Sequence, residues 1–325
     1  MISVEDIYNA VIQNEESKKE FYRWLGASLI GSECTRHIAL TFCCAYNNNF
    51  SARILRVFEN GHQAEQRIGA DIKLTGAKII DEQLEIDAPN CNGHAGSTLD
   101  GVIEFANGEQ MILEYKTAKS VSFKKYVKDP IKISNPRYYA QVQVNMALRK
   151  LKKAMWICEN KDTNELHIEY IDYNEEDALY YLNLMKKFIV DGFTGDKISD
   201  NPDYFQCRWC AANSICHGKA VPRMHCLTCC HATPIAGGKF KCMRYNAEMP
   251  DEQLPKGCDE HVFHPDFINL PMVDNGPYWI SYRLPTGELI CNCSKESFPR
   301  IKINEEMKDI VTSEEWAKRG VLYED

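Results

Sequence analysis

The stretch GVIEFANGEQMILEYK, residues 101–116, carries the clearest structural pattern in this chain. Two β-prone runs, GVIEF and QMILEYK, flank Asn107-Gly108, a dipeptide that favours the tight turn of a β-hairpin. Pairing of the two runs brings Asp100, which precedes the first run, towards the edge that carries Glu114 and Lys116. Side chains alternate along a strand, so Glu114 and Lys116 share one face and the tyrosine between them points the other way.

An acidic residue, a hairpin and a Glu-x-Lys triplet together suit phosphodiester hydrolysis. That reaction needs a divalent cation at the scissile phosphate and a deprotonated water in line with it. Asp100 and Glu114 offer hard oxygen ligands for Mg²⁺ or Mn²⁺, and Lys116 can position the water and stabilise developing negative charge. The same triplet also arises by chance on solvated strands, so the neighbouring segments must decide between the two interpretations.

Helices and strands alternate on both sides of this hairpin. Apolar positions at helical spacing predict helices within residues 17–30 and 52–72, and short β-prone runs predict antiparallel strands from Ala77 to Tyr115. The predicted elements that follow are a helix in 137–151, strands in 154–160 and 165–173, and a helix from about 175 to 188. A helix between strands predicts an α/β (α+β) core.

Length and composition exclude several classes of protein. At 325 residues and 37.3 kDa the chain suits one large domain with a smaller module, and no apolar run approaches the roughly 20 residues of a membrane span. The first twenty residues are acidic and polar, unlike a secretory signal, which predicts a cytoplasmic location. A net charge of -8 leaves room only for a local basic groove.

Two helical segments add groups that suit the same site. Glu65 lies on the predicted helix 52–72 with His62 about one turn earlier, so both can face the cation. Gln141 lies on the helix after the strand pair, where its amide could orient the water or the carboxylates. The alternative for Gln141 is an ordinary helix position without a catalytic role.

The order of four motifs resembles phage lambda-type exonucleases and RecB-type nuclease domains. The motifs are G-H-x-x-E, T-L-D-G, L-E-Y-K-T and Y-A-Q-V-Q-x-x-M, and the resemblance covers roughly residues 20 to 218. It implies a PD-(D/E)xK, restriction-endonuclease-like core, although Leu99 stands where that pattern has proline. The catalytic set that it implies is Glu65, Asp100, Glu114 and Lys116, completed by Gln141, with His62 as the matching histidine and further metal ligand.

The resemblance implies a divalent-metal-dependent DNA exonuclease, phage-encoded, that processes linear ends for recombination or repair. Its expected partners are DNA and a recombination protein. Two alternatives stay open. One is an inactive DNA-binding or recombination scaffold that keeps the fold, and the other is a zinc-dependent regulatory protein whose function lies in residues 223–265.

Fifteen cysteines in a chain without an export signal point to metal sites more than to disulfides. FQCRWCAANSICHG contains Cys207, Cys210 and Cys216 at C-x2-C-x5-C spacing, without a local fourth ligand. One early cysteine with three late ones resembles the CRISPR-associated exonucleases and the AddB nuclease domain, which implies a 4Fe-4S cluster completed by Cys34. The same four thiolates also suit Zn²⁺, so that alternative stays open.

A second group of cysteines predicts a small zinc-ribbon-like module. Its expected ligands are Cys226, Cys229, Cys242 and Cys258. Cys230 is an alternative to Cys229, His261 is the expected substitute and His264 lies nearby. The predicted domains are therefore a nuclease domain over 1–221, a cysteine-rich module over 222–265 and a β-like tail over 266–325.

Basic residues that could contact phosphates fall into two segments and two single positions. The first segment holds Lys124, Lys125, Lys128 and Lys132, and the second holds Arg149, Lys150, Lys152 and Lys153. Arg23 and Arg36 are the single candidates. Each segment can equally be a solvated helix face.

Overall fold

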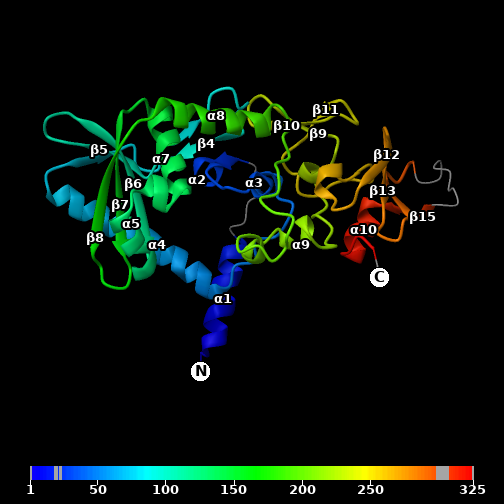
Figure 1. The fold of residues 1–325 in the computed structure, drawn as a ribbon, viewed down its shortest axis with the longest axis horizontal. Coiled ribbons are helices and arrows are strands. Elements are labelled where there is room, and N and C mark those ends of the chain that lie inside the picture. The colour runs from blue at the N-terminus through cyan, green and yellow to red at the C-terminus, as the bar shows by residue number, and fades with distance from the viewer. Residues whose placement is uncertain (1, 18–20, 22–23, 298–306, 324–325) are drawn as a thin grey trace. The chain divides into compact units, whose positions relative to one another are not determined.

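The computed structural model describes residues 2–17, 21, 24–297 and 307–323, and the chain divides into two compact units (Figure 1). Unit 1 comprises Met1–Glu20, Trp24–Glu33 and Asn49–Asp191, and unit 2 comprises Phe21–Arg23, Cys34–Asn48 and Gly192–Asp325. No helix in the described part of the chain is long and apolar enough to cross a membrane.

Unit 1 is a mixed α/β fold around a five-stranded sheet of order β2-β5-β6-β7-β8. Its strands are β1 (Leu25–Gly26), β2 (Lys78–Ile80), β3 (Glu85–Asp87), β4 (Ala95–Thr98), β5 (Gly101–Glu104), β6 (Gln110–Ala118), β7 (Lys153–Asn160) and β8 (Leu166–Asp172). Its helices are α1 (Val4–Ser17), α2 (Ala27–Ile30), α4 (Ala52–Leu74), α5 (Ser120–Lys128), α6 (Ile131–Ser134), α7 (Pro136–Arg149) and α8 (Glu175–Ile189). β6 and β7 are parallel and the other neighbours in this sheet are antiparallel.

The predicted hairpin is confirmed as β5–β6. Gly108 has φ +83°, a left-handed conformation that glycine adopts without strain, and its N–H donates to Phe105 O at 2.9 Å. The register pairs Gly101 with Leu113 and Glu104 with Gln110. By the same register Asp100 falls opposite Glu114, so the turn fixes the acidic residues that the sequence placed there.

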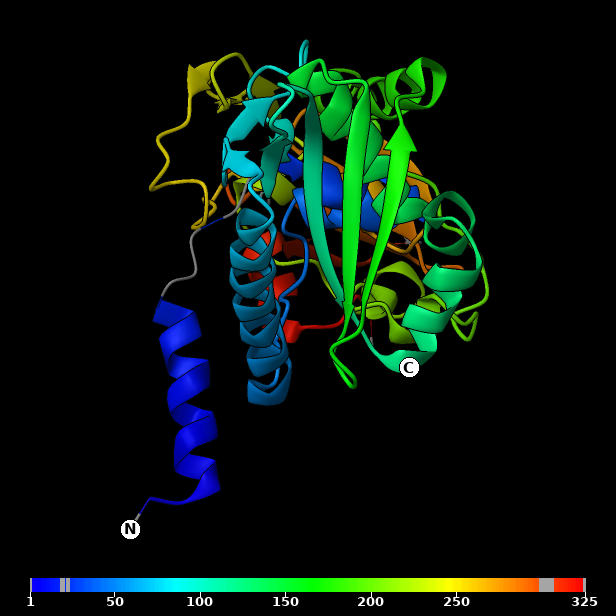
Figure 2. The same ribbon diagram turned by 90° about the vertical axis from the view of Figure 1, so that its left-hand side faces the viewer.

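Helices cover both faces of the sheet, and Figure 2 shows the long helix α4 beside the strands. On the α4 face, Ile68 and Ile72 pack with Leu113 and Tyr115 in one buried apolar cluster. On the other face, α5 and α7 pack against a second cluster that contains Trp156. Tyr115 thus points away from the face of Glu114, as the alternation along β6 predicts.

Local signals place α7 against the sheet. Asn135 caps its N-terminus by accepting the N–H of Tyr138, and Pro136 occupies the first turn. The helix ends at Arg149, and the residue that follows it, Lys150, has φ +57°. At Gly31 an added Cβ would lie 2.6 Å from the Ala140 side chain, so the absence of a side chain lets the chain after α2 approach α7.

The predicted helix over residues 17–30 is wrong in part. Leu25–Gly26 is a strand, β1, that pairs in parallel with β4, and the N–H of Leu25 donates to His94 O at 2.8 Å. Leu25 is fully buried there, so its apolar character serves a strand at this point and not a helix face. Arg23 lies outside the described residues.

Unit 2 contains two small sheets, of order β11-β10-β9 and β12-β13-β14-β15. Its strands are β9 (Ala232–Ile235), β10 (Lys239–Cys242), β11 (Ala247–Glu248), β12 (Met272–Gly276), β13 (Trp279–Arg283), β14 (Leu289–Cys293) and β15 (Met307–Thr312). Its helices are α3 (Thr35–Phe42), α9 (Asn213–Cys216) and α10 (Ser313–Arg319), with 3-10 turns η1 (Cys207–Trp209), η2 (Cys226–Thr228) and η3 (Pro265–Phe267). Phe263, Tyr282 and Trp316 anchor a core shared by the second sheet and α10.

Candidate active site

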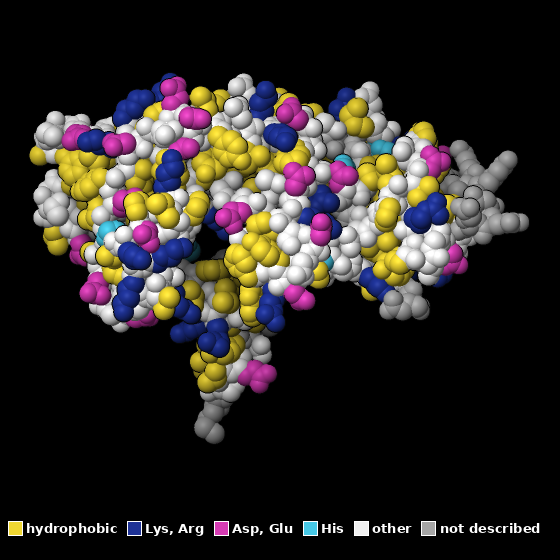
Figure 3. Space-filling view, in the orientation of Figure 1, with side chains coloured by type: hydrophobic (Ala, Val, Ile, Leu, Met, Phe, Trp, Pro, Cys, Tyr) yellow, Lys and Arg dark blue, Asp and Glu magenta, His cyan; other side chains and the backbone are white. Residues whose placement is uncertain are grey.

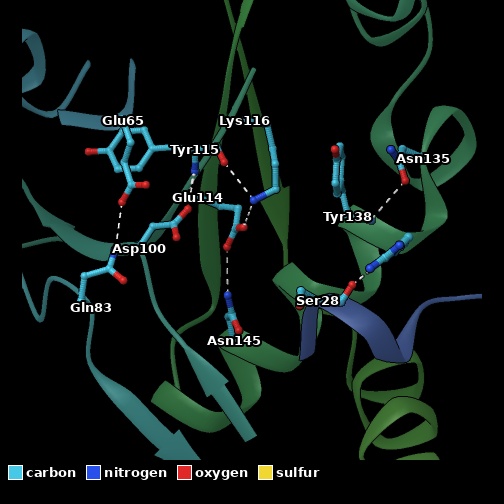
Figure 4. Close-up of polar contacts among 11 residues, drawn as sticks. Ser28, Glu65, Gln83, Asp100, Glu114, Tyr115, Lys116, Asn135, Tyr138 and Asn145 are labelled. Carbon is cyan, nitrogen blue, oxygen red and sulfur yellow. Dashed lines mark hydrogen bonds and ion pairs between the residues drawn. The ribbon is translucent and has the colours of Figure 1, made fainter. Parts of the chain in front are cut away.

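Asp100 and Glu114 lie together where the hairpin begins (Figure 4). Asp100 ends the connection into β5, and its Oδ2 accepts the backbone N–H of Tyr115 at 2.8 Å. This bond ties the carboxylate to the strand that carries Glu114. The negative charge of Asp100 contributes to the raised pKa of Glu114, as expected for two neighbouring carboxylates.

Glu114 is fully buried and both of its carboxylate oxygens have partners. Lys116 Nζ forms an ion pair with Oε1, and Asn145 Nδ2 donates to Oε2 at 3.1 Å. Burial is the largest cause that raises the pKa of Glu114, to about 8, with the Asp100 charge second. A buried acid beside another acid favours a bound cation, because the cation relieves their repulsion and stabilises the ionised form.

Lys116 is the cation of this cluster. Its Nζ also donates to Tyr115 O at 2.9 Å and lies 5.4 Å from the centre of the Tyr138 ring. Burial lowers its pKa, but Glu114 and Asp100 outweigh burial and hold the pKa of Lys116 above its ordinary value. Lys116 is therefore charged at neutral pH, and its side chain keeps 20% exposure.

Helix α4 brings Glu65 to the same carboxylates. Ser51 begins the helix by accepting the Ile54 N–H, and Gln83 donates to Glu65 Oε1 at 2.9 Å. Burial and then the charge of Asp100 raise the pKa of Glu65, while Lys116 and His62 lower it. These effects place Glu65 within electrostatic range of Asp100 and Lys116, with the exposed His62 beside it.

Helix α7 carries Gln141, which the sequence predicted for the site, and Asn145, which it did not. Gln141 is buried, and no hydrogen bond joins its side chain to Asp100, Glu114 or Lys116 in the described structure. Asn145, one turn later, makes the contact with Glu114. Asn145 follows Gln141 by four residues, so both lie on one face of the helix, and this spacing could have predicted Asn145 as a second candidate.

Glu65, Asp100 and Glu114 influence one another electrostatically, but they do not form a complete coordination shell for a metal ion. Across the described residues, no group of three or more His, Cys, Asp or Glu side chains has the arrangement of a preformed metal site. The donor chemistry nevertheless suits a hard divalent cation, because Glu65, Asp100 and Glu114 are all carboxylates and Glu114 has a raised pKa.

Cation binding at this cluster should strengthen as the pH rises from about 6 to about 9. Only an ionised carboxylate would hold the cation, and because burial raises the pKa of Glu114 to about 8, protons would compete with it below that pH. We expect the apparent Mn²⁺ affinity to fall about tenfold per pH unit below this value, measured from the EPR signal of free Mn²⁺. The Glu114→Gln variant should lose this dependence, and a flat wild-type profile would contradict the assignment.

The first cysteine set lies wholly within unit 2. Cys34 precedes α3, Cys207 begins η1, Cys210 follows η1, and Cys216 ends α9. Burial raises the pKa of Cys207, with the Cys34 charge second, and burial raises the pKa of Cys216 to about 11, with contributions from Cys210 and Cys34. Cys34 is thus an electrostatic neighbour of the other three thiols that the sequence grouped with it, and none of the four forms a disulfide.

The second cysteine set lines one pocket in unit 2. Cys226, Cys229, Cys242 and Cys258 all border it, together with His231 and His261. Burial is the main cause that raises the pKa of Cys226 to about 12, followed by the charges of the other three thiols.

Of the two histidines that the sequence placed near these cysteines, His261 borders the pocket. His261 Nε2 lies 3.1 Å from the carbonyl oxygen of His225, so Nε2 carries the proton, and the buried Nδ1 has no partner among the described residues. His264 instead accepts the N–H of Asp266 and caps η3. Cys230 contacts Cys229, and their coupling lowers the pKa of Cys230 and raises that of Cys229.

The basic candidates behave differently from one another. Figure 3 shows Lys and Arg side chains gathered over the part of unit 1 that contains α4 and α5. Lys124, Lys125 and Lys128 are exposed and form no ion pair among the described residues. The remaining members of the two segments include Lys132, paired with Asp177 at 2.7 Å, Arg149, paired with Asp81 at 2.7 Å, and Lys153, 3.7 Å from Glu109.

Arg36 has a structural role within unit 2. Its guanidinium donates to Thr194 O at 3.0 Å and to the backbone carbonyl of Asp266. These contacts occupy two of its nitrogens, whereas the α5 lysines are free to meet an anion. The exposed side of α5 is therefore the better basic surface.

No protein-family model matches this chain, and no curated protein matches it. Similar solved structures include the alkaline exonuclease LHK-Exo from Laribacter hongkongensis, also solved in complex with dAMP. It has a TM-score of 0.40 and 15% identity, covering 58% of this chain and 92% of that chain. SSO0001 has a TM-score of 0.39 and 14% identity, covering 65% of this chain and 94% of that chain. At these scores neither a residue's role nor an activity is transferred to this chain, and the candidate site rests on the contacts of its own residues.

Proposed function

We propose that this chain is a divalent-metal-dependent DNA exonuclease that hydrolyses phosphodiester bonds. The observation that supports this proposal most directly is that Glu114 is fully buried, lies beside Asp100 and forms an ion pair with Lys116. A purely structural strand would gain nothing from burying this acid next to a second acid. Phosphodiester hydrolysis needs such a combination of clustered carboxylates and one fixed cation.

Each residue has a chemical role in this proposal. Glu65, Asp100 and Glu114 would hold Mg²⁺ or Mn²⁺, with His62 as a further ligand at the exposed side. A bound divalent cation would polarise the scissile phosphate and acidify a water molecule. Lys116 orients the attacking water and stabilises the negative charge that develops on the phosphate oxygens. Gln141 is proposed to orient the water or the carboxylates from α7.

The exposed lysines on α5 support a nucleic-acid substrate. The unpaired lysines on α5 would contact the phosphate backbone, because such contacts position nucleic acid without reading its sequence. A linear DNA end, single- or double-stranded, is the proposed substrate. Processing of ends for recombination or repair, a recombination protein as partner and a phage origin are extensions of this proposal.

The alternative function is an inactive DNA-binding or recombination scaffold. A scaffold has no need of the raised pKa of Glu114 or of the buried ion pair with Lys116. Release of acid-soluble nucleotides from linear DNA tests both proposals, with Mg²⁺, Mn²⁺ or EDTA present. Release in either metal, abolished by EDTA and by Glu65→Gln, is expected of the nuclease. Binding without release under every condition would favour the scaffold.

For unit 2 we propose a 4Fe-4S cluster held by Cys34, Cys207, Cys210 and Cys216. Four thiolates are the ligand set of such a cluster, and the contribution of Cys34 to the raised pKa values of Cys210 and Cys216 fits a shared site. The cluster would join Cys34 to a segment more than 170 residues later in the sequence, which stabilises the unit by restricting the unfolded chain.

Protein purified without oxygen should therefore be brown and contain iron and acid-labile sulfide. The Cys34→Ser variant should lose the colour and the iron, because a cluster ligand is missing. Cys44→Ser removes a partly buried thiol of the same unit that lies outside the set, and it should keep both. A colourless wild-type protein with bound zinc would overturn the iron-sulfur assignment in favour of a zinc site.

For the second cysteine set we propose a structural Zn²⁺ held by Cys226, Cys229, Cys242 and Cys258. Their shared pocket and the unpartnered Nδ1 of His261 fit a soft, tetrahedral site, in which His261 would substitute for one thiolate. Zinc would order a small module with limited core of its own. The alternative of a zinc-dependent regulatory protein, whose function lies in residues 223–265, would be weakened if removal of that module left cleavage intact.

A further inference from the structure

Asn145 is the polar residue of α7 that contacts the proposed metal site most directly. Its side chain is fully buried, and Nδ2 donates to Glu114 Oε2 at 3.1 Å. Figure 4 shows the amide approaching Glu114 from α7, while Lys116 approaches from its own strand. The two partners therefore hold different oxygens of one carboxylate.

The orientation of the amide follows from charge. If the amide were reversed while Glu114 is ionised, as a metal ligand would be, its oxygen would face the carboxylate oxygen and the two acceptors would repel each other. Nδ2 must therefore face Glu114, which leaves Oδ1 on the other side. Oδ1 is buried and has no hydrogen-bond partner among the described residues. A buried acceptor without a donor destabilises the folded state, so the helix keeps this amide despite an energetic cost.

A neighbouring amide shows how an ordinary structural residue behaves on the same helix. Gln143 is also fully buried, but its Nε2 donates to Asp172 O at 3.0 Å and its Oε1 accepts the Asn174 N–H at 2.8 Å. Both ends of that amide are satisfied by backbone groups, at the end of β8 and at the N-cap of α8. Asn145 differs because one end meets a proposed metal ligand and the other end has no partner.

We propose that Asn145 is a positioning residue for the metal site. Asn145 fixes Glu114 through Oε2, and Oε1 stays directed to Lys116. With a divalent cation bound to Glu114, the unpartnered Oδ1 of Asn145 would be an acceptor for a water molecule of that cation. This inference rests on the proposed metal-dependent function. Residues that orient a metal-binding carboxylate typically change metal affinity by about 10- to 100-fold when they are removed.

Direct binding of Mn²⁺ tests the proposal without reference to activity. The dissociation constant is obtained from the EPR signal of free Mn²⁺. Only the Mn²⁺ binding that is lost in the Asp100→Asn variant is assigned to this site. Asn145→Leu, which has similar volume and no donor or acceptor, should weaken this binding about 10- to 100-fold. Asn145→Ala should weaken it in the same direction and serves if the leucine variant does not fold. Gln143→Leu is the matched control, expected to lower the melting temperature and leave the Mn²⁺ dissociation constant within about twofold.

A double-mutant cycle separates positioning from a general structural effect. In a Glu114→Gln background, Asn145→Leu should add less than about a twofold loss of Mn²⁺ affinity, because its effect runs through Glu114. Folded Asn145 variants that bind Mn²⁺ as tightly as the wild type would overturn the inference and leave the proposed function standing. Absence of any Asp100-dependent Mn²⁺ binding in the wild type would overturn the proposed metal site, and the inference with it.

Discussion

Replacing Lys116 by methionine should lower the rate of DNA hydrolysis by about 10³-fold. Lys116 is the cation bound to the buried Glu114, and it lies beside Asp100. Methionine keeps much of the apolar stem that packs near the Tyr138 ring, while the charge and the hydrogen-bond donors disappear. The loss should appear in kcat, because the charge acts on the phosphate oxygens as they become more negative.

The matched control for this variant is Lys78→Met. Lys78 lies on β2 of the same sheet, is exposed and pairs with Glu104 at 3.7 Å, so its charge should matter little. The rates of both variants are compared under saturating Mg²⁺, with circular dichroism to verify folding. A folded Lys116→Met protein that hydrolyses DNA at the wild-type rate would remove Lys116 from the mechanism.

The Asp100→Asn variant should lose at least about 10³-fold of the metal-dependent rate. The asparagine oxygen can still accept the Tyr115 N–H that Asp100 accepts at 2.8 Å, so the hairpin should keep its geometry. Only the negative charge is removed, and a hard divalent cation depends on that charge. The loss should persist when the Mn²⁺ concentration is raised, because a neutral amide is a weak ligand.

Asp87→Asn provides the comparison, since Asp87 is an exposed acid on β3 of the same unit. It should keep wild-type rates with Mg²⁺ and with Mn²⁺. Equal melting temperatures for the two variants would show that the effect at position 100 is chemical. Wild-type activity in Asp100→Asn would mean that the cation, if one is used, binds elsewhere.

The hairpin and its acidic pair could be predicted from the sequence because both depend on local interactions. Asn107-Gly108 specifies the turn, the turn fixes the register, and the register sets Asp100 opposite Glu114. The alternation along β6 then determines that Lys116 shares the face of Glu114. Each step needs only residues within one short segment of the chain.

Asn145 was missed because its role depends on tertiary packing. Only the docking of α7 on the sheet brings its amide to Glu114, 31 residues earlier in the sequence. β1 was missed for the same reason, since Leu25 lies in a strand through its pairing with β4, about 70 residues away. Helical spacing of apolar residues cannot report such a partner.

For the cysteines, the sequence predicted a group of ligands but not the metal that they bind. Spacing and resemblance grouped Cys34 with the three cysteines at 207–216. All four lie in unit 2, and Cys34 contributes to the raised pKa values of the other three. Spacing does not select the metal, because four thiolates suit an iron-sulfur cluster and zinc alike. Metal analysis of the purified protein therefore decides a question that the ligand set leaves open.

The central claim is tested most directly with end-labelled linear DNA, single- and double-stranded, beside a closed circular duplex of the same sequence. The wild-type protein should shorten the linear DNA progressively from an end with Mg²⁺ or Mn²⁺, spare the circle and lose all activity in EDTA, while Asp100→Asn should leave every substrate intact. Metal-independent cleavage, equal cleavage by Asp100→Asn, or no cleavage of any substrate under all conditions would contradict the account.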